Sequence, residues 1–121
     1  MKGLIISVFI TLFALLTGCG QGYKTHKTVE DFLENQMQIT QYKIIEWGKI
    51  DSTFRISSDV LAVLRRQGKI QFKRDFSYCV PSAKLNFLTV KYVKDANIKD
   101  TVSQTFYIND QQTGVVAFKQ N

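Results

Sequence analysis

The pattern of hydrophobic and polar positions divides the chain into a short apolar leader and a longer segment of mixed character. Residues 4–16 are almost continuously apolar, and only Ser7 and Thr11 interrupt the run. The run is shorter than the roughly 20 residues that a helix needs to span a bilayer, but it suits the hydrophobic region of a secretory signal. Lys2 precedes it and small residues follow it. We therefore predict that residues 1–18 are a signal peptide.

Two later segments have the apolar spacing of amphipathic helices. The first, residues 28–37, begins at Thr28, which is a favourable N-cap residue. The second is shorter, residues 57–68, with Ser58 as its cap and Gly68 at its end. The residues expected to face the core are Val29, Phe32, Leu33 and Met37 in the first helix and Val60, Leu61 and Leu64 in the second.

The remaining segments are rich in β-branched and aromatic residues and predict strands. Residues 41–56 predict one long strand or two short ones around Asp51-Ser52, and Ile70, Phe72 and Phe76 suggest another before Pro81. Alternation over 84–93 and 101–108, then a polar turn at 109–114 and the run 115–120, predict an antiparallel hairpin arrangement. We expect an α+β fold over residues 28–121, with the N-terminal helix packed on a mostly antiparallel sheet and a second short helix. The residues expected to share faces are Leu88, Val90 and Tyr92, then Phe87, Thr89 and Val93, and also Val102, Phe106 and Ile108.

Composition supports a single folded domain with a basic surface. The chain has 121 residues, of which 45% are apolar, and 16 Lys and Arg against 10 Asp and Glu give a net charge of +6. This charge suits an anionic neighbour such as a membrane surface, and it also suits ordinary solubility. Residues 19–27 contain two glycines and lack apolar periodicity, so we expect a flexible tether before the domain.

The residues Leu16-Thr17-Gly18-Cys19, placed directly after the apolar run, resemble the lipobox of bacterial lipoproteins. The resemblance implies cleavage before Cys19 and a thioether from its sulfur to a diacylglycerol carrying acyl chains such as palmitate. Two acyl chains suffice for stable membrane anchoring. In such lipoproteins an aspartate directly after the cysteine resembles an inner-membrane retention signal, and this chain has Gly20 there. The absence of the aspartate favours the outer membrane, with the domain facing the periplasm. The alternative is an ordinary signal peptide, after which Cys19 could form a disulfide with Cys79.

The order of elements and the stretch QTFYINDQQTGVVAFK at 104–119 resemble small cystatin-like and NTF2-like domains, and also short lipoproteins of gut Bacteroidetes with no assigned activity. The resemblance implies the fold over roughly residues 28–120. It implies no activity, because these folds carry enzymes, inhibitors and binding modules alike.

Candidate catalytic chemistry is sparse. One histidine, His26, and an isolated Cys79 offer no metal cluster and no nucleophile–base pair, so we expect no metal, no cofactor and a buried, inert Cys79 thiol. An NTF2-like hydrolase or isomerase would need an acidic base beside a tyrosine. A cystatin-like inhibitor would need an exposed hairpin wedge, whereas GVVAF at 114–118 lies in a predicted strand. The candidate pairs combine Asp51, Asp59 or Glu46 with Tyr42, Tyr92 or Tyr107, and we expect Ile45 and Trp47 to face the core.

One cluster of charge stands out. Arg65, Arg66, Lys69, Lys73 and Arg74 place five cations within ten residues. They predict either an anionic docking patch, for lipid phosphate, lipopolysaccharide or an acidic partner, or a solvated helix end. Nucleic acid is not expected as a partner of a secreted, tethered domain. The sequence thus favours a lipid-anchored, periplasm-facing module of the cell envelope that binds an envelope component and catalyses no reaction.

Overall fold

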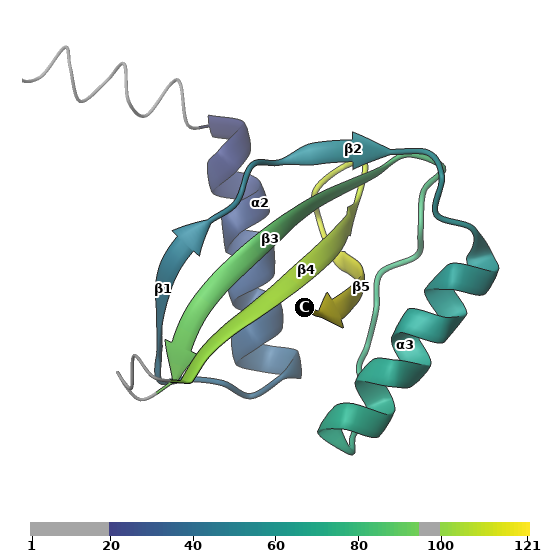
Figure 1. Ribbon diagram of the computed structural model, residues 1–121. Helices are drawn as coiled ribbons and strands as arrows, with labels where there is room; N and C mark the ends of the chain where they lie inside the picture. Colours follow the sequence, from purple (N-terminus) through teal and green to yellow (C-terminus); the bar gives the residue numbers. More distant parts are fainter. Residues whose placement is uncertain (1–19, 95–99) are drawn as a thin grey trace, which may run out of the picture.

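The computed structural model describes residues 20–94 and 100–121. The predicted signal peptide, Cys19 and the lipobox lie outside the described residues, as do residues 95–99 of the polar connection. The α+β fold, with a helix packed on an antiparallel sheet, is confirmed (Figure 1). In chain order the elements are helix α2 (Gly20–Asp31), its π-helical continuation η1 (Phe32–Gln36), β1 (Tyr42–Trp47), β2 (Asp51–Thr53), α3 (Ser58–Phe72), β3 (Leu85–Lys94), β4 (Thr101–Asn109) and β5 (Val115–Gln120).

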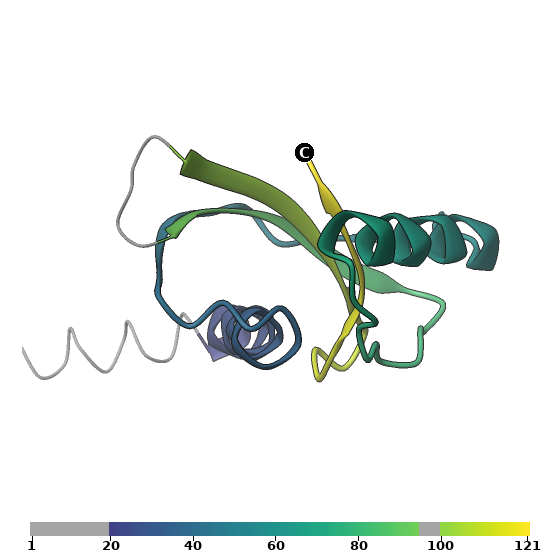
Figure 2. The same cartoon turned by 90° about the horizontal axis from the view of Figure 1, so that it is seen from below.

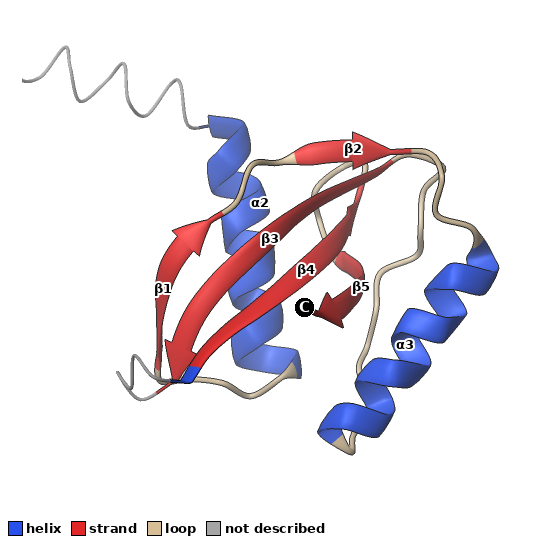
Figure 3. Cartoon of the chain, in the orientation of Figure 1, coloured by secondary structure: helices blue, strands red, loops and turns tan. Residues whose placement is uncertain are grey.

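The sheet is built around β3, as the strands in Figure 3 show. Both β1 and β2 pair antiparallel with one edge of β3, and β4 pairs with the other edge from Leu85↔Asn109 to Val93↔Thr101. The predicted hairpin is confirmed, since β4 and β5 pair antiparallel across the turn at 110–114. The order is therefore β1-β3-β4-β5, with β2 beside β1 along the β3 edge.

The main core lies between α2 with η1 and the concave face of the curved sheet (Figure 2). All four residues predicted to form the helix face are buried, so that prediction is confirmed. They meet alternate residues of the long strands, which point to the same face of the sheet. The buried members of this core are Val29, Phe32, Leu33, Met37, Leu88, Val90, Tyr92, Phe106, Ile108, Val115 and Phe118.

The start of the domain differs from the sequence prediction. Residues 20–27, expected to be a flexible tether, form the first turns of α2, and Thr25 is fully buried. The Thr25 hydroxyl donates to Gln112 Oε1 at 2.9 Å, so the β4–β5 turn holds this helix in place. Thr28 lies inside the helix, where its hydroxyl is 2.9 Å from the Lys24 carbonyl oxygen and 2.8 Å from that of Gln112. Its predicted role as N-cap is wrong.

Helix α3 is longer than predicted. Ser57 caps it in place of the predicted Ser58, accepting a hydrogen bond from the Val60 amide at 3.3 Å, and the helix continues through Gly68 to Phe72. A Cβ at Gly68 would lie 3.2 Å from the Phe118 ring, so the glycine permits close packing of α3 on β5 instead of ending the helix. The end comes at Lys73, whose φ of 55° is left-handed. Leu61 packs on the second face of the sheet, whereas Val60 is exposed.

The strand predicted from Ile70, Phe72 and Phe76 is absent from the described residues. Ile70 and Phe72 belong to the last turn of α3. Phe72 continues the helical spacing of Leu61 and Leu64 and packs against the core, whereas Ile70 is exposed. Phe76 lies in the irregular segment that follows, which runs beside β5 and bonds it through the Cys79 amide and the Val115 carbonyl, 2.8 Å apart. Pro81 lies outside any strand.

Residues 41–56 form two short strands, as one of the two alternatives predicted, but the break lies at 48–50 and Asp51 and Ser52, the predicted break, begin β2. A bulge between Ile44 and Glu46 changes the alternation of β1, so Ile44 and Trp47 pack against the main core. Ile45, predicted to face the core with Trp47, is 49% exposed. The bulge is the reason, because an inserted residue reverses the faces of all residues beyond it.

His26 stacks on Trp47 with ring centroids 3.9 Å apart, and its burial lowers its pKa from 6.5. The imidazole of His26 therefore takes up a proton more readily in the unfolded chain than in the folded one. The contribution of neutral His26 to the stability of the fold is complete above pH 6.5 and is lost as the pH falls below it. We expect thermal stability to drop between about pH 8 and about pH 5, and His26→Gln to reduce that drop. Melting curves of both proteins at the two pH values test this, and an identical drop would contradict it.

Candidate functional site: a basic hollow beside helix α3

Two of the five predicted docking cations hold the fold together. The Arg65 side chain donates from Nε to the Val116 carbonyl at 3.0 Å and from Nη2 to the Cys79 carbonyl at 3.2 Å. Arg74 Nη1 donates to the Gln36 carbonyl at 2.9 Å. Arg65 thereby covers the outer edge of strand β5, where unpaired backbone groups would otherwise be open to another chain. The interpretation of all five cations as one patch is therefore corrected.

The other three cations are exposed, two of them on α3 and one at the residue that ends it. Arg66 and Lys69 are three residues apart, which makes them neighbours on one helix face, and Lys73 follows as the left-handed residue after the last helical turn. Lys69 Nζ lies 3.1 Å from Asp75 Oδ1, but both side chains are largely exposed, so the pair is weak and open to exchange.

Apolar side chains share this exposed face. Ile70 is 69% exposed and Val63 is also exposed, and both fall on the side of the helix that carries Arg66. The opposite side of the helix packs on the sheet through Leu61 and Phe72. Sequence reasoning missed the apolar part of the face because it assigned Ile70 to a strand core.

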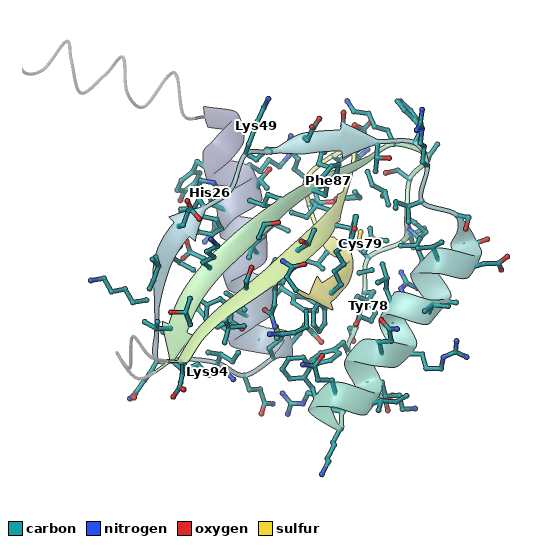
Figure 4. All side chains as sticks on the ribbon, viewed as in Figure 1. His26, Lys49, Tyr78, Cys79, Phe87 and Lys94 are labelled. Atoms are coloured by element: carbon teal, nitrogen blue, oxygen red, sulfur yellow. The ribbon has the colours of Figure 1, made fainter. Side chains whose placement is uncertain are left out.

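A hollow of about 420 Å³ opens beside these cations, and it is called the basic hollow below. Arg65 lies 4.9 Å above the Tyr78 ring, so a cation covers part of the aromatic lining. Figure 4 shows Tyr78 on the segment beside α3. The hollow offers positive charge and aromatic surface together. Its lining residues are Arg65, Arg66, Lys69, Asp75, Phe76 and Tyr78.

The Tyr78 hydroxyl is a neutral group in this site. Its oxygen is buried and has no hydrogen-bond partner among the described residues. It faces Gly68, where an added Cβ would lie 3.3 Å away. Burial raises the pKa of Tyr78 to about 12, although the nearby Arg65 lowers it. The hydroxyl therefore keeps its proton at neutral pH and supplies neither a base nor a nucleophile.

The structure does not bring together the acidic residues and tyrosines considered for catalysis. Asp51 and Asp59 are exposed, and Glu46 pairs with Lys91 at 3.3 Å. Tyr92 is buried and donates to Gln104 Oε1 at 2.9 Å, and Tyr42 donates to Glu34 Oε2 at 3.0 Å. Burial raises the pKa of both tyrosines. Tyr107 packs against Phe87 on the second sheet face. In the described part of the chain, therefore, no hydrogen bond joins a candidate acid to a candidate tyrosine.

The other sequence candidates are also placed. Cys79 is a free, half-buried thiol, less buried than expected. Residues 115–118 lie buried in β5, and the preceding turn packs on α2 through Gln112, so the described hairpin presents no exposed wedge of the inhibitor type. Within residues 20–94 and 100–121, no group of three or more His, Cys, Asp or Glu could hold a metal ion.

Comparison with known proteins adds no relative: no family model, curated protein or solved structure matches the chain. Of the helices that the structure describes, none has the length and apolar character needed to cross a bilayer.

Proposed function

We propose that the chain is a lipid-anchored protein of the cell envelope whose domain binds a phosphorylated amphiphile, of which lipopolysaccharide is the example, and catalyses no reaction. The anchor is the acylated Cys19, the outer membrane is favoured over the inner, and the domain faces the periplasm. The single observation that carries the binding proposal is the exposed part of α3 at the basic hollow: Arg66 and Lys69 line the hollow, Ile70 is exposed on the helix next to Arg66, and Lys73 follows at the helix end.

The chemistry of this face fits both parts of such a ligand. A guanidinium such as that of Arg66 matches the oxygens of a phosphate group in a two-point contact, and lysine ammonium groups add charge. Ile70 and Val63 are exposed on α3 four and three residues from Arg66, and they offer apolar surface where acyl chains gain by leaving water. The ligand's phosphate can replace Asp75 as the partner of Lys69, because that exposed pair stabilises the fold very little.

The variant Arg66→Glu/Lys69→Glu/Lys73→Glu tests the proposal. Retention of the detergent-solubilised protein on immobilised lipopolysaccharide should fall about tenfold or more, because attraction by three cations becomes repulsion by three carboxylates. Folding should be nearly intact, since all three side chains are exposed and exposed charges contribute little to stability. Wild-type retention should weaken as salt is added.

A matched control separates local contact from net charge. Lys43, Lys91 and Lys94 are exposed lysines on β1 and β3, and reversing them to glutamate gives the same net charge as the test variant. We expect this control to retain lipopolysaccharide nearly as well as the wild type. Equal retention by wild type and test variant at low salt would show that the face is only solvated. Equal loss in the test and control variants would show that net charge alone accounts for retention.

A further inference from the structure

The geometry of α2 fixes which end of the domain meets the membrane, if Cys19 is acylated as proposed above. Helix α2 begins at Gly20, the residue directly after Cys19, and Thr25 ties the helix to the β4–β5 turn. The anchor is therefore joined to a packed element and not to a long flexible tether. We propose that the end of the domain at which α2 begins docks on anionic phospholipid headgroups.

Several elements gather at this end of the domain. A polar hollow of about 530 Å³ brings the first turns of α2 together with β2, the residues that precede β3, and the β4–β5 turn. Figure 1 shows β2 level with the start of α2. The surface that surrounds the anchor point is thus formed by four separate segments. The residues that line the hollow are Gly22, Ile50, Asp51, Ser52, Lys84, Asn86, Asp110 and Gln112.

Six aromatic and basic side chains on these segments or directly next to them are called the anchor rim below, and all but the half-buried Lys84 are exposed. Phe54, directly after β2, is 72% exposed, and Tyr23, near the start of α2, is 66% exposed. Figure 4 shows Lys49 projecting outward beside the start of α2. The anchor rim consists of Tyr23, Lys24, Lys49, Phe54, Arg55 and Lys84.

The charge of the rim favours an anionic surface. Two carboxylates lie among its four cations: Asp110 pairs with Lys84 at 3.5 Å, and Asp51 accepts a hydrogen bond from the Ser52 amide at 2.8 Å. Exposed aromatic rings settle at the boundary between headgroups and acyl chains, and cations near it are attracted by anionic lipids. Two exposed rings and a set of cations thus lie on, or directly next to, the segments that line the polar hollow at the end of the domain where α2 begins.

The same arrangement leaves the basic hollow accessible. The last turns of α3 lie at the end of the domain away from the start of α2 (Figure 1). Docking through the anchor rim therefore points Lys69 and Lys73 toward the aqueous compartment. Lysine reactivity can distinguish the two surfaces, because each carries lysines of its own.

The test uses the full-length acylated protein in vesicles of phosphatidylcholine and phosphatidylglycerol in equal parts. Lysines are modified briefly with a water-soluble acylating reagent, and the digest is read by mass spectrometry. Relative to vesicles of phosphatidylcholine alone, Lys49 and Lys84 should react about fivefold more slowly, as expected for cations held at an anionic surface. Lys69, Lys73 and Lys94 should react at unchanged rates.

Two variants keep the test specific. Lys49→Glu/Phe54→Ser should remove the protection of Lys84. The control Lys94→Glu/Ile45→Ser also changes one lysine and one exposed apolar residue, but on β3 and β1, and should leave the protection of Lys84 intact. Protection of Lys69 and Lys73 in place of Lys49 and Lys84 would overturn the proposal, and so would equal reactivity of all five. The N-terminal peptide of the same digest reports acylation, so failure of the anchor is distinguished from failure of the docking surface.

Discussion

Cys19→Ala is expected to abolish the incorporation of labelled fatty acid into the protein. The thiol is the only group in the lipobox-like sequence that can form a stable thioether to diacylglycerol, and alanine offers no substitute. Each buried CH₂ group contributes ~0.8 kcal/mol to membrane binding, so the mature domain without acyl chains should leave the detergent phase at least roughly a hundredfold more readily. In-gel detection of an alkyne-labelled palmitate, followed by detergent phase partition, measures both effects.

Cys79 provides the matched control for this experiment. Cys79→Ala removes the other cysteine and should leave both fatty-acid labelling and partition at the wild-type level, because Cys79 lies half-buried in the folded domain. Labelling that persists in Cys19→Ala and disappears in Cys79→Ala would contradict the assignment of the lipid to Cys19.

Phe118→Ala is expected to cost about 3–5 kcal/mol in the free energy of unfolding, the usual range for a fully buried phenylalanine. Phe118 on β5 is 1% exposed and lies at the centre of an aromatic cluster that joins α2, α3 and the sheet. Its ring centroid is 5.5 Å from that of Phe76 and 5.6 Å from that of Phe72. Alanine would leave a cavity where these elements meet. Equilibrium unfolding in urea measures the loss.

Phe54→Ala is the control for this substitution. It deletes the same group from a side chain that is 72% exposed, so we expect a change within about 0.5 kcal/mol. If Phe118→Ala costs no more than Phe54→Ala, then the aromatic cluster does not hold α3 against the sheet.

The parts of the fold that sequence predicted well are those whose pattern reports burial directly. Leu88, Val90 and Tyr92 alternate on β3 and all face the main core, and Val29 and Leu33 keep helical spacing on α2. Such patterns follow from the geometry of a single element packed on one side. The turn at 110–114 was also predictable, because its residues have strong turn preferences.

The parts that sequence missed depend on contacts between distant residues. The polar residues 20–27 are helical because Thr25 and Thr28 bond the β4–β5 turn, which local pattern does not reveal. Gly68 lies inside α3 because Phe118 packs closely against it. The bulge in β1 moves Ile45 to the surface, although its neighbours continue the strand.

The candidate site was predictable as a set of cations but not in its arrangement. Arg65 and Arg66 are adjacent and chemically alike, yet Arg65 bonds the carbonyls of Val116 and Cys79, whereas Arg66 is exposed. Only the packing of α3 beside β5 separates the two roles. The aromatic lining from Phe76 and Tyr78 depends on the same packing.

The most direct test of lipid anchoring is the intact mass of the N-terminal peptide of protein extracted from membranes. The proposal predicts a peptide that begins at Cys19 and carries the mass of a diacylglycerol on its sulfur. A mature protein that retains Met1, or one that begins at or near Cys19 with an unmodified thiol, would contradict it.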